Sequence, residues 1–388
     1  MPASPKTPLA LYVHIPFCKA KCTYCDFYSL AGGEANIPIF VDVLLMEIQA
    51  AREKHDLEDH FIDTIFFGGG TPNMLTPSQL EQVIDALAEL FPLAELAGNT
   101  EIGLEINPGE ASLEALKNYR EIGFNRVSIG IQSFQQKLLT FMSRIHDPAQ
   151  SMQTFQHARA AGFNNISGDL IFAVPGQTRE MWETDLQTLI DLGPEHISTY
   201  SLTVEEGTAL KRWVDAGHVH MLEETIDTGM YAAGRKLLEQ AGYLNYEVSN
   251  FARQGYACRH NLNYWTGVEY LGFGPSAHSF FDGQRWWNPR DLHTYITDLK
   301  EIGTCKPEVE AIDAITAANE MILTRLRLNG GLNLAAFRST HGIDLLSDRR
   351  DVLEKWGQEL EVRDEHLRVT SQGWSLIDEI SSDLMQNN

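Results

Sequence analysis

The segment LALYVHIPFCKAKCTYCDF, residues 9–27, joins a strand-like run to a cluster of cysteines. Its first seven residues are mostly apolar or β-branched, as in a buried strand. A loop with the spacing C-x3-C-x2-C follows at once and contains Cys18, Cys22 and Cys25. Reactive loops placed directly after buried strands are the means by which a parallel barrel builds its site.

The alternation of strands and amphipathic segments continues to about residue 240. Strands are predicted at 9–15, 64–69, 102–107, 126–132, 167–173 and 196–202. Helices are predicted near 38–55, 77–90, 111–122, 149–161, 178–191 and 223–240. Thr76 before Pro77, and Thr178 ahead of Glu180, are typical helix N-caps. This order predicts a parallel sheet with right-handed crossovers, either open and doubly wound or an incomplete barrel.

The turns favour the barrel. Special segments follow nearly every strand: HIPFCKAKC, GGGTP, EINPG, IQSF and AVPGQ. An open sheet would gather such segments at one switch point, whereas a barrel places them at the carboxyl ends of successive strands. The predicted fold class is therefore α/β, a partial (β/α)6-type barrel related to the TIM barrel.

The pattern changes after residue 242. YLNYEVSNFA, CRHNLNYW and EYLGFGPSAHSF indicate short strands and glycine turns, and GFGPSA (272–277) is a packed turn rather than a dinucleotide site. From about 290 the chain is mainly helical, with a hairpin expected in LEVRDEHLRVT. The predicted domains are a barrel over 1–242, a barrel-closing extension over 243–289, and a smaller, winged-helix-like domain over 290–388.

Composition excludes several functions. The 388 residues include 30 Lys and Arg against 53 Asp and Glu, a net charge of −23. Such a charge disfavours both nucleic acid and a polybasic membrane anchor. Nothing approaches the ~18 consecutive apolar residues of a spanning helix. We expect a cytoplasmic protein that meets the inner face of the membrane only through a local docking surface.

The five cysteines indicate a metal site in a reducing compartment rather than a disulfide framework, because their number is odd and three are clustered. Spacing alone leaves three interpretations of the cluster open. These are an open iron–sulfur centre, a zinc site that takes a fourth ligand such as His14, and free thiols. Cys258 and Cys305 stand alone. We expect Cys258 to be a small buried side chain and assign no role to Cys305.

Polar residues accompany the later strands. Glu105, Gln132 and Asp169 lie on three consecutive strands of the predicted barrel, so they converge on one space. A single residue of this kind is more often a satisfied buried group than a ligand. Three of them together predict a ligand site.

These segments resemble the radical S-adenosylmethionine (SAM) enzymes, and among them the oxygen-independent coproporphyrinogen III oxidase group. The resemblance runs in order along nearly the whole chain. It rests on YVHIPFCKAKCTYCDF, GGGTP, LEINPG, RVSIGIQSF, RIH, GDLIFAVPGQT and HNLNYW. It implies that Cys18, Cys22 and Cys25 hold three irons of a [4Fe–4S] cluster while the fourth iron binds SAM. The residues that it assigns to SAM are Tyr12, Tyr24, Gly69, Gly70, Thr71, Glu105, Gln132, Arg144 and Asp169.

Two departures separate the chain from the oxidases, which carry a further cysteine two positions after the third. Phe27 occupies that position here, and only eleven residues precede Tyr12. The motif HNLNYW (260–265) instead resembles the heme-chaperone branch of the family. That resemblance implies heme binding by His260, Asn261, Tyr264 and Trp265.

The expected function is therefore that of a heme chaperone without coproporphyrinogen dehydrogenase activity, in which SAM is regulatory or only conditionally catalytic. Its expected partners are heme, membrane or respiratory heme proteins that receive it, a heme donor and an electron donor, with a homodimer left open. Arg253 and Arg259 are candidates to meet the heme propionates. The alternative is an enzyme that oxidatively decarboxylates the propionate side chains of coproporphyrinogen III.

Overall fold

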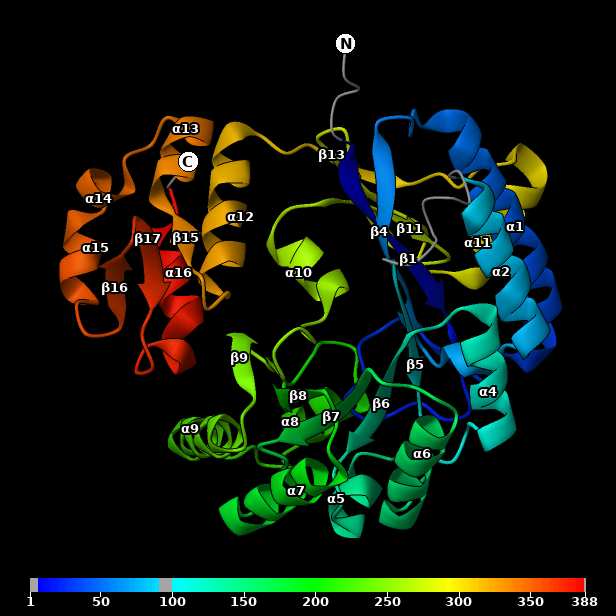
Figure 1. Cartoon of the computed structure of the whole chain (residues 1–388), viewed down its shortest axis with the longest axis horizontal. Coiled ribbons are helices and arrows are strands. Elements are labelled where there is room, and N and C mark those ends of the chain that lie inside the picture. Colours follow the sequence, from blue (N-terminus) through cyan, green and yellow to red (C-terminus); the bar gives the residue numbers. More distant parts are fainter. Residues whose placement is uncertain (1–5, 91–99, 387–388) are drawn as a thin grey trace.

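A curved, largely parallel sheet forms the centre of the molecule (Figure 1). The structure is a computed structural model that describes residues 6–90 and 100–386. Six parallel strands run in chain order across the sheet. They are β1 (Thr7–Ile15), β4 (His60–Gly69), β5 (Glu101–Ile106), β6 (Arg126–Gln132), β7 (Ile166–Phe172) and β8 (His196–Ser201). The predicted partial barrel is confirmed, and all six predicted strands are present.

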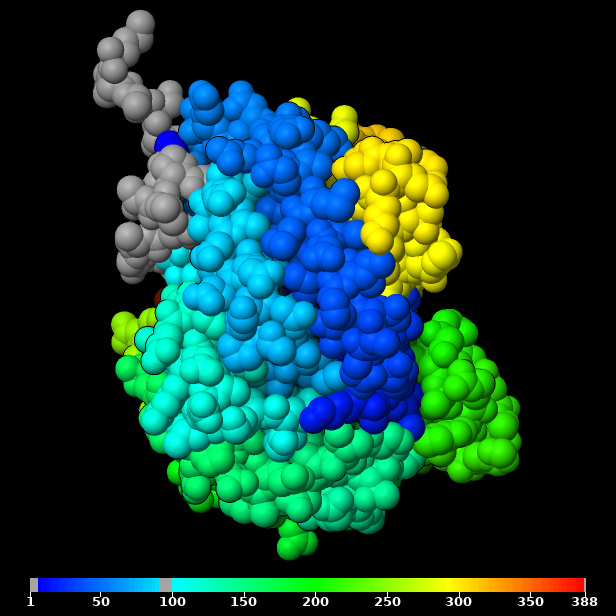
Figure 2. Space-filling model, turned by 90° about the vertical axis from the view of Figure 1, so that its right-hand side faces the viewer, coloured from blue at the N-terminus to red at the C-terminus, as the bar shows by residue number. Residues whose placement is uncertain are grey.

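Helices cover the outer face of these strands. They are α1 (Ile37–Lys54), α2 (Pro77–Glu89), α4 (Leu113–Ile122), α6 (Pro148–Ala160), α7 (Arg179–Leu192) and α9 (Glu224–Gln240), with the shorter α5 (Gln136–Phe141) and α8 (Ala209–Asp215) between them. Thr76 forms a full capping box with Gln79, and Thr178 accepts from the Met181 amide. Figure 2 shows α1, α2 and α4 side by side. Of the predicted helices, α2, α4, α6 and α7 have side-chain N-caps of their own, whereas α1 and α9 have none and depend on their packing against the sheet.

Residues 243–289 extend the sheet at both sides. β9 (Leu244–Glu247) and β10 (Asn250–Ala252) lie beside β8, whereas β11 (Glu269–Phe273), β12 (His278–Phe281) and β13 (Gln284–Trp287) lie beside β1. β11 is parallel to β1 and the other additions are antiparallel. The strand β14 (Glu308–Glu310) ends the sheet beyond β13. Within the described residues β9 and β14 do not pair, so the barrel is not closed by hydrogen bonds.

The motif HNLNYW does not continue the strand pattern predicted around it. Residues Arg259–Trp265 form the helix α10, which lies where the chain crosses from β10 to β11. Ala252 pairs with His196 at the start of β8, and Glu269 pairs with Leu9 near the start of β1. The crossing therefore covers the amino end of the barrel, and the strand expected here is wrong.

The last part of the chain has its own apolar core, built from residues between Ala318 and Leu384. It contains α12 (Ala314–Leu326), α13 (Leu334–His341), α14 (Leu345–Asp348), α15 (Arg350–Lys355) and α16 (Ile377–Leu384) around a small sheet of β15 (Leu332–Asn333), β17 (His366–Val369) and β16 (Leu360–Arg363). The predicted hairpin is β16–β17. Its winged-helix character stays a prediction.

The domain boundaries also stay predictions. The helix α11 (Leu292–Ile302) buries Leu292, Tyr295 and Leu299 in the barrel core. It lies beside α1, where Figure 2 shows it in yellow against the blue helix. By packing, α11 therefore belongs with the barrel. In the ranges described, no helix is both long and apolar enough to cross a membrane.

Candidate functional site

A cavity of about 610 Å³ opens at the carboxyl ends of the barrel strands. Cys18, Cys22 and Cys25 line it from the loop after β1. Of the nine residues expected to bind SAM, the following eight also line it: Tyr24, Gly69, Gly70, Thr71, Glu105, Gln132, Arg144 and Asp169. The structure thus brings together the thiols and nearly all of the polar residues that the sequence separates by more than a hundred positions.

The cysteine loop is braced from several directions. Cys18 ends the two-residue strand β2 (Phe17–Cys18), which pairs with β3 (Leu30–Ala31) and so closes the loop at its base. Lys21 donates to the Phe27 carbonyl at 2.7 Å and to the Ser29 hydroxyl at 2.8 Å. Thr23 donates from its amide to the Met142 carbonyl at 3.3 Å. These contacts hold a short irregular segment in one conformation, as a ligand loop requires.

The GGGTP segment packs directly on the cysteine loop. The Gly69 φ is +103°, and a Cβ there would meet the His14 ring at 2.5 Å. A Cβ on Gly70 would meet the Phe17 carbonyl oxygen at 2.7 Å. Thr71 donates from its amide to the Phe17 carbonyl at 2.7 Å and from its hydroxyl to Cys18 Sγ at 3.4 Å. The glycines are therefore needed for the close approach of two loops that share the cavity.

The donor set fits a multi-iron cluster better than a single zinc ion. In the described part of the chain, no three Cys, His, Asp or Glu side chains come close enough to share one metal ion. A structural zinc site needs four ligands around one ion. An iron–sulfur cluster spreads its thiolates over several irons. Burial raises the pKa of Cys25 to about 11 and also raises the pKa of Cys18, so these two thiols are neutral until a bound metal ionises them.

Two buried carboxyl groups face each other inside the barrel. Burial, together with the charge of Asp169, raises the pKa of Glu105 to about 8. Burial also raises the pKa of Asp169, although that group accepts from the hydroxyls of Ser128 at 2.9 Å and Ser167 at 3.1 Å. Neither carboxyl has a cation as a hydrogen-bond partner within the residues described, although the charge of Arg126 acts on Asp169 from a distance. A cationic ligand is the complement that this pair lacks.

Two further side chains carry unused polar atoms. Gln132 Oε1 and Arg144 Nε are buried without a hydrogen-bond partner. Gln132 has a φ of +65°, which is rare for a residue other than glycine and places its side chain at the cavity. Arg144 donates to Asn107 Oδ1 at 2.6 Å and to Cys22 Sγ at 3.4 Å. Buried polar atoms without a partner call for an explanation, and here they belong to residues that line a cavity suited to a polar ligand.

Sequence reasoning missed some residues of this site. Asn107 joins Thr71 to Arg144, since its amide donates to Thr71 Oγ1 at 2.9 Å. Tyr200, at the end of β8, also lines the cavity. Both follow barrel strands at the carboxyl end, and that position was the available signal. Tyr12, by contrast, lines a different hollow, which it shares with Tyr264.

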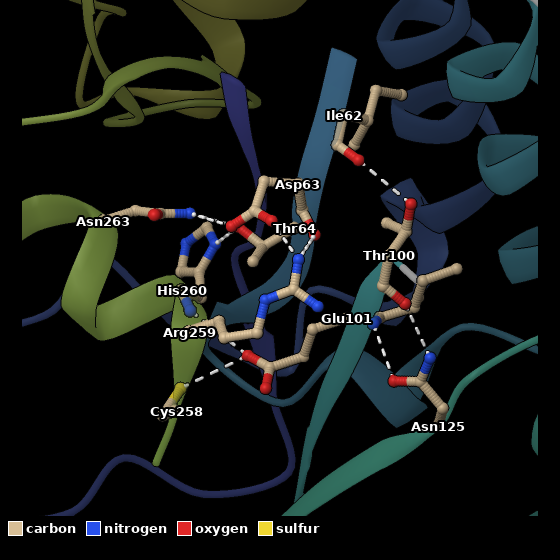
Figure 3. A network of polar contacts seen from close by, with 11 residues as sticks. Ile62, Asp63, Thr64, Thr100, Glu101, Asn125, Cys258, Arg259, His260 and Asn263 are labelled. Carbon is tan, nitrogen blue, oxygen red and sulfur yellow. Dashed lines mark hydrogen bonds and ion pairs between the residues drawn. The ribbon is translucent and has the colours of Figure 1, made fainter. Parts of the chain in front are cut away.

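The HNLNYW helix is held by hydrogen bonds and an ion pair to residues at the amino ends of β4 and β5 (Figure 3). Asp63 forms an ion pair with Arg259 and accepts from Asn263 at 2.9 Å. Glu101 accepts from the His260 amide at 3.1 Å and from the Cys258 thiol at 3.6 Å. Burial raises the pKa of Cys258 to about 12, as expected for an inert buried thiol.

His260 is a core histidine in this structure. Its Nδ1 lies 2.8 Å from Thr64 Oγ1, and its Nε2 lies 3.0 Å from the Tyr264 hydroxyl. Its ring stacks on Phe66 with centroids 5.0 Å apart. Burial lowers the pKa of His260 to about 3, so the ring is neutral. Both ring nitrogens are already hydrogen-bonded, and binding of iron would require one of these bonds to break.

The remaining heme candidates lie apart from one another. Trp265 faces the C-terminal domain, where the Arg327 guanidinium lies 5.8 Å from its ring centroid. Arg253 lies over the Tyr243 ring, and Arg259 is paired with Asp63. Both arginines therefore have partners within the fold, and their expected role toward propionates stays a prediction. The heme roles of Asn261 and Trp265 stay predictions.

Family models match both parts of the chain. The model of the radical SAM superfamily matches residues 12–189, and that of the HemN C-terminal domain matches residues 312–376. Over 99% of this chain and 91% of the other, the fold is also that of the coproporphyrinogen III oxidase HemN from Escherichia coli, with a TM-score of 0.84 and 23% identity. The partial barrel with its cysteine loop is thus that of a radical SAM protein.

The relatives narrow this class. The heme chaperone HemW of Bacillus subtilis is 34% identical over 86% of this chain and 87% of its own length. The heme chaperone HemW of Escherichia coli is 36% identical over 71% of this chain and 72% of its own. The chain belongs to the HemW family.

Proposed function

We propose that this protein is a heme chaperone, which binds heme and transfers it to apoproteins that need it. The relationship to HemW proteins along most of the chain carries this proposal. Two local features support it. Phe27 stands where the oxidases carry a further cysteine, and the motif HNLNYW resembles that of the heme-chaperone branch. The likeness to HemN, at 23% identity, supports the fold and is not evidence for the same activity.

We also propose that Cys18, Cys22 and Cys25 hold a [4Fe–4S] cluster, and that the polar residues of the same cavity hold SAM. Such a cluster supplies an electron to its ligand when both are bound. The chain's own residues supply the frame. Gly69 and Gly70 let the GGGTP segment pack closely against the cysteine loop. Arg144 is placed for a carboxylate, and Glu105 with Asp169 is placed for a cation.

The proposal requires further partners: a heme donor, an electron donor for the cluster, and recipient proteins in the respiratory chain or elsewhere at the membrane. It places the protein in the cytoplasm, which keeps thiols reduced. A homodimer is compatible with it. In this proposal heme is the cargo. SAM either regulates the protein or reacts only under certain conditions, and it is not consumed each time heme is transferred.

A transfer assay tests the proposal. Anaerobically reconstituted protein is titrated with heme, with and without SAM, and then mixed with apomyoglobin as a general heme acceptor. We expect saturable binding of one heme per chain and transfer faster than from free heme in the same buffer. No saturable binding would overturn the proposal. Sustained decarboxylation of coproporphyrinogen III by the same preparation would also overturn it, in favour of the oxidase alternative.

A further inference from the structure

A chain of hydrogen bonds runs through the inside of the barrel, from the cluster cavity to α10. It begins at Asp169, which lines the cavity and accepts from the Ser167 hydroxyl at 3.1 Å. Ser167 Oγ lies 2.8 Å from His196 Nδ1, and His196 Nε2 lies 2.8 Å from the Tyr246 hydroxyl. The Tyr246 hydroxyl accepts from the amide of Cys258, the N-cap of α10, at 3.3 Å. Three side chains therefore join the ligand cavity at one end of the barrel to the helix at the other.

We propose that Ser167, His196 and Tyr246 couple the two places, so that a cationic ligand beside Asp169 strengthens the hydrogen bond at the N-terminus of α10. The inference rests on the proposed function in one respect, because it takes SAM, a sulfonium, as that cation. His196 is a positioning residue here. It does not line the cavity, and it acts only through its two hydrogen-bond partners.

The sheet fixes the geometry of this chain. Ser167 on β7 pairs directly with His196 on β8, and His196 pairs on its other side with Ala252 on β10. Tyr246 lies on β9, the next strand beyond β10. Ser167 and His196 are both buried, so water does not compete for their hydrogen bonds. Burial and the charge of Arg126 lower the pKa of His196, and the ring therefore carries a single proton.

When Asp169 is ionised, the hydrogen bonds of this chain can run in only one direction. A carboxylate only accepts, so Ser167 donates its single proton to Asp169 and accepts from His196 Nδ1. His196 Nε2 then carries no proton and accepts from the Tyr246 hydroxyl. The Tyr246 oxygen in turn accepts from the Cys258 amide, which can only donate. Every group in the chain is satisfied in this arrangement, and each bond polarises the next.

A neutral Asp169 removes this restriction, and burial raises the pKa of this carboxyl. A protonated carboxyl can donate to Ser167, and the chain can then reverse, with His196 Nε2 donating to Tyr246. The Tyr246 proton would then have no acceptor among the residues described. A hydroxyl that donates to His196 is also the better acceptor for the Cys258 amide. A cation in the cavity favours ionised Asp169 and therefore favours the arrangement that holds α10 more firmly.

The bond at Cys258 matters because α10 has no side-chain cap of its own. Acceptors from outside the helix hold its first turn instead. The Tyr246 hydroxyl accepts from the Cys258 amide, and the Glu101 carboxylate accepts from the His260 amide (Figure 3). A helix of seven residues has little stability by itself. How often its first turn opens therefore depends on these outside bonds.

Hydrogen–deuterium exchange of the full-length, anaerobically reconstituted protein, with and without saturating SAM, tests the coupling. In the wild type we expect SAM to slow amide exchange in residues 258–262 by about two- to fivefold. Tyr246→Phe and Ser167→Ala each remove one hydroxyl, on opposite sides of His196. In both variants this SAM-dependent difference should disappear, while equilibrium dialysis still shows bound SAM. A variant that merely loosens α10 exchanges faster with and without SAM alike, so it does not mimic this result.

Tyr231→Phe is the matched control, because its hydroxyl donates to the Val248 carbonyl at 2.9 Å and lies outside the chain. It should keep the SAM-dependent difference. If the wild type binds SAM and exchange in 258–262 does not change, the inference is wrong while the proposed SAM site stands. Retention of the difference in either Tyr246→Phe or Ser167→Ala would also overturn it. Absence of SAM binding in the wild type would remove the proposed SAM site itself, and this inference with it.

Discussion

At the scale of single residues, the Thr64 hydroxyl lies 2.8 Å from His260 Nδ1 and is the hydrogen-bond partner of that ring nitrogen. We expect Thr64→Val to destabilise the folded protein by about 1–3 kcal/mol, because a buried ring nitrogen and the Asn263 amide would lose a partner. Chemical denaturation of the reconstituted protein measures this. Thr184→Val, at an exposed helical threonine, is the control and should change stability by less than about 0.5 kcal/mol. Equal effects would contradict the buried role of Thr64.

The pair of Glu105 and Asp169 predicts a pH dependence. The pKa of Glu105 is about 8 in the folded chain, raised from 4.5 by burial and by Asp169. A carboxyl with a raised folded pKa supports the fold fully below about pH 4.5, and that support is lost as the pH rises through 8. Without SAM, the stability advantage of Glu105→Gln over wild type should therefore grow by up to about 1.4 kcal/mol per pH unit between pH 5 and 8.

Urea unfolding at pH 5, 6.5 and 8 measures that difference. Glu361→Gln, on the exposed hairpin, is the control and should show no such trend. A constant difference between Glu105→Gln and wild type across this range would contradict the raised pKa of Glu105.

Among single residues, the sequence predicted those that stand in a local motif, such as the cysteines, and those that lie at the ends of predicted strands. The three cysteines, Glu105, Gln132 and Asp169 meet at one cavity because parallel strands bring their carboxyl ends together. The state of His260 was not predictable. Its partner Thr64 lies 196 positions away, and no local pattern reveals such a bond.

Among the elements, the helix α10 has its N-terminus stabilised from another part of the fold. Cys258 occupies its N-cap without a side-chain hydrogen bond to the helix, and the Glu101 carboxylate accepts from the His260 amide instead. The strand predicted for this segment was wrong for that reason: local capping signals are missing, and a distant carboxylate replaces them. Helix α2, by contrast, carries its cap Thr76 in its own sequence and was predicted.

Glu101→Ala should therefore fray α10. We expect faster backbone amide exchange in 259–265, and a higher Kd for heme because Tyr264 would no longer be held. Thr76→Ala removes a cap of similar kind from α2 and should speed exchange there alone. Hydrogen–deuterium exchange with mass spectrometry reads both segments in one experiment. Unchanged exchange in 259–265 would show that Glu101 does not hold the helix.

The close contact between GGGTP and the cysteine loop predicts that a side chain at Gly70 would disturb the cluster site. Gly70→Ala would place a Cβ 2.7 Å from the Phe17 carbonyl and 2.8 Å from the Ile15 carbonyl, so the two segments must separate. We expect cluster iron and sulfide to fall well below the wild-type content. Gly229→Ala, within α9 and with open space around it, is the control and should keep full content. A full complement in Gly70→Ala would contradict the tight contact.

Across the whole molecule, two apolar cores are joined around α10. Arg325 of α12 donates to the carbonyls of Trp265 and Thr266, and Arg327 lies over the Trp265 ring. The backbone of 327–329 also bonds to β9 and the residue after it, with Asn329 donating to the Tyr246 carbonyl at 3.0 Å. The fold class was predictable from alternating elements, but this joint was not, because it depends on pairings between residues about sixty positions apart.

Arg325→Ala should weaken the joint. We expect calorimetry to show a single unfolding transition in the wild type and two separated transitions in the variant, because each core retains its own apolar contacts. Arg363→Ala, on the exposed edge of the hairpin, is the control and should keep the wild-type profile. One unchanged transition in Arg325→Ala would mean that other contacts suffice to couple the cores.

Over the residues that the structure describes, the sheet does not close on itself, and this has a mechanical consequence. In a closed barrel, strand number and stagger fix the circumference, because every strand is bonded on both sides. Here β9 and β14 end the sheet, and α10 lies in the crossing between its two flanks. In the described part of the chain no continuous ring of hydrogen bonds runs around the barrel, and α10 occupies the crossing between its two ends. The circumference of the barrel is therefore not fixed by strand number and stagger, as it is in a closed barrel.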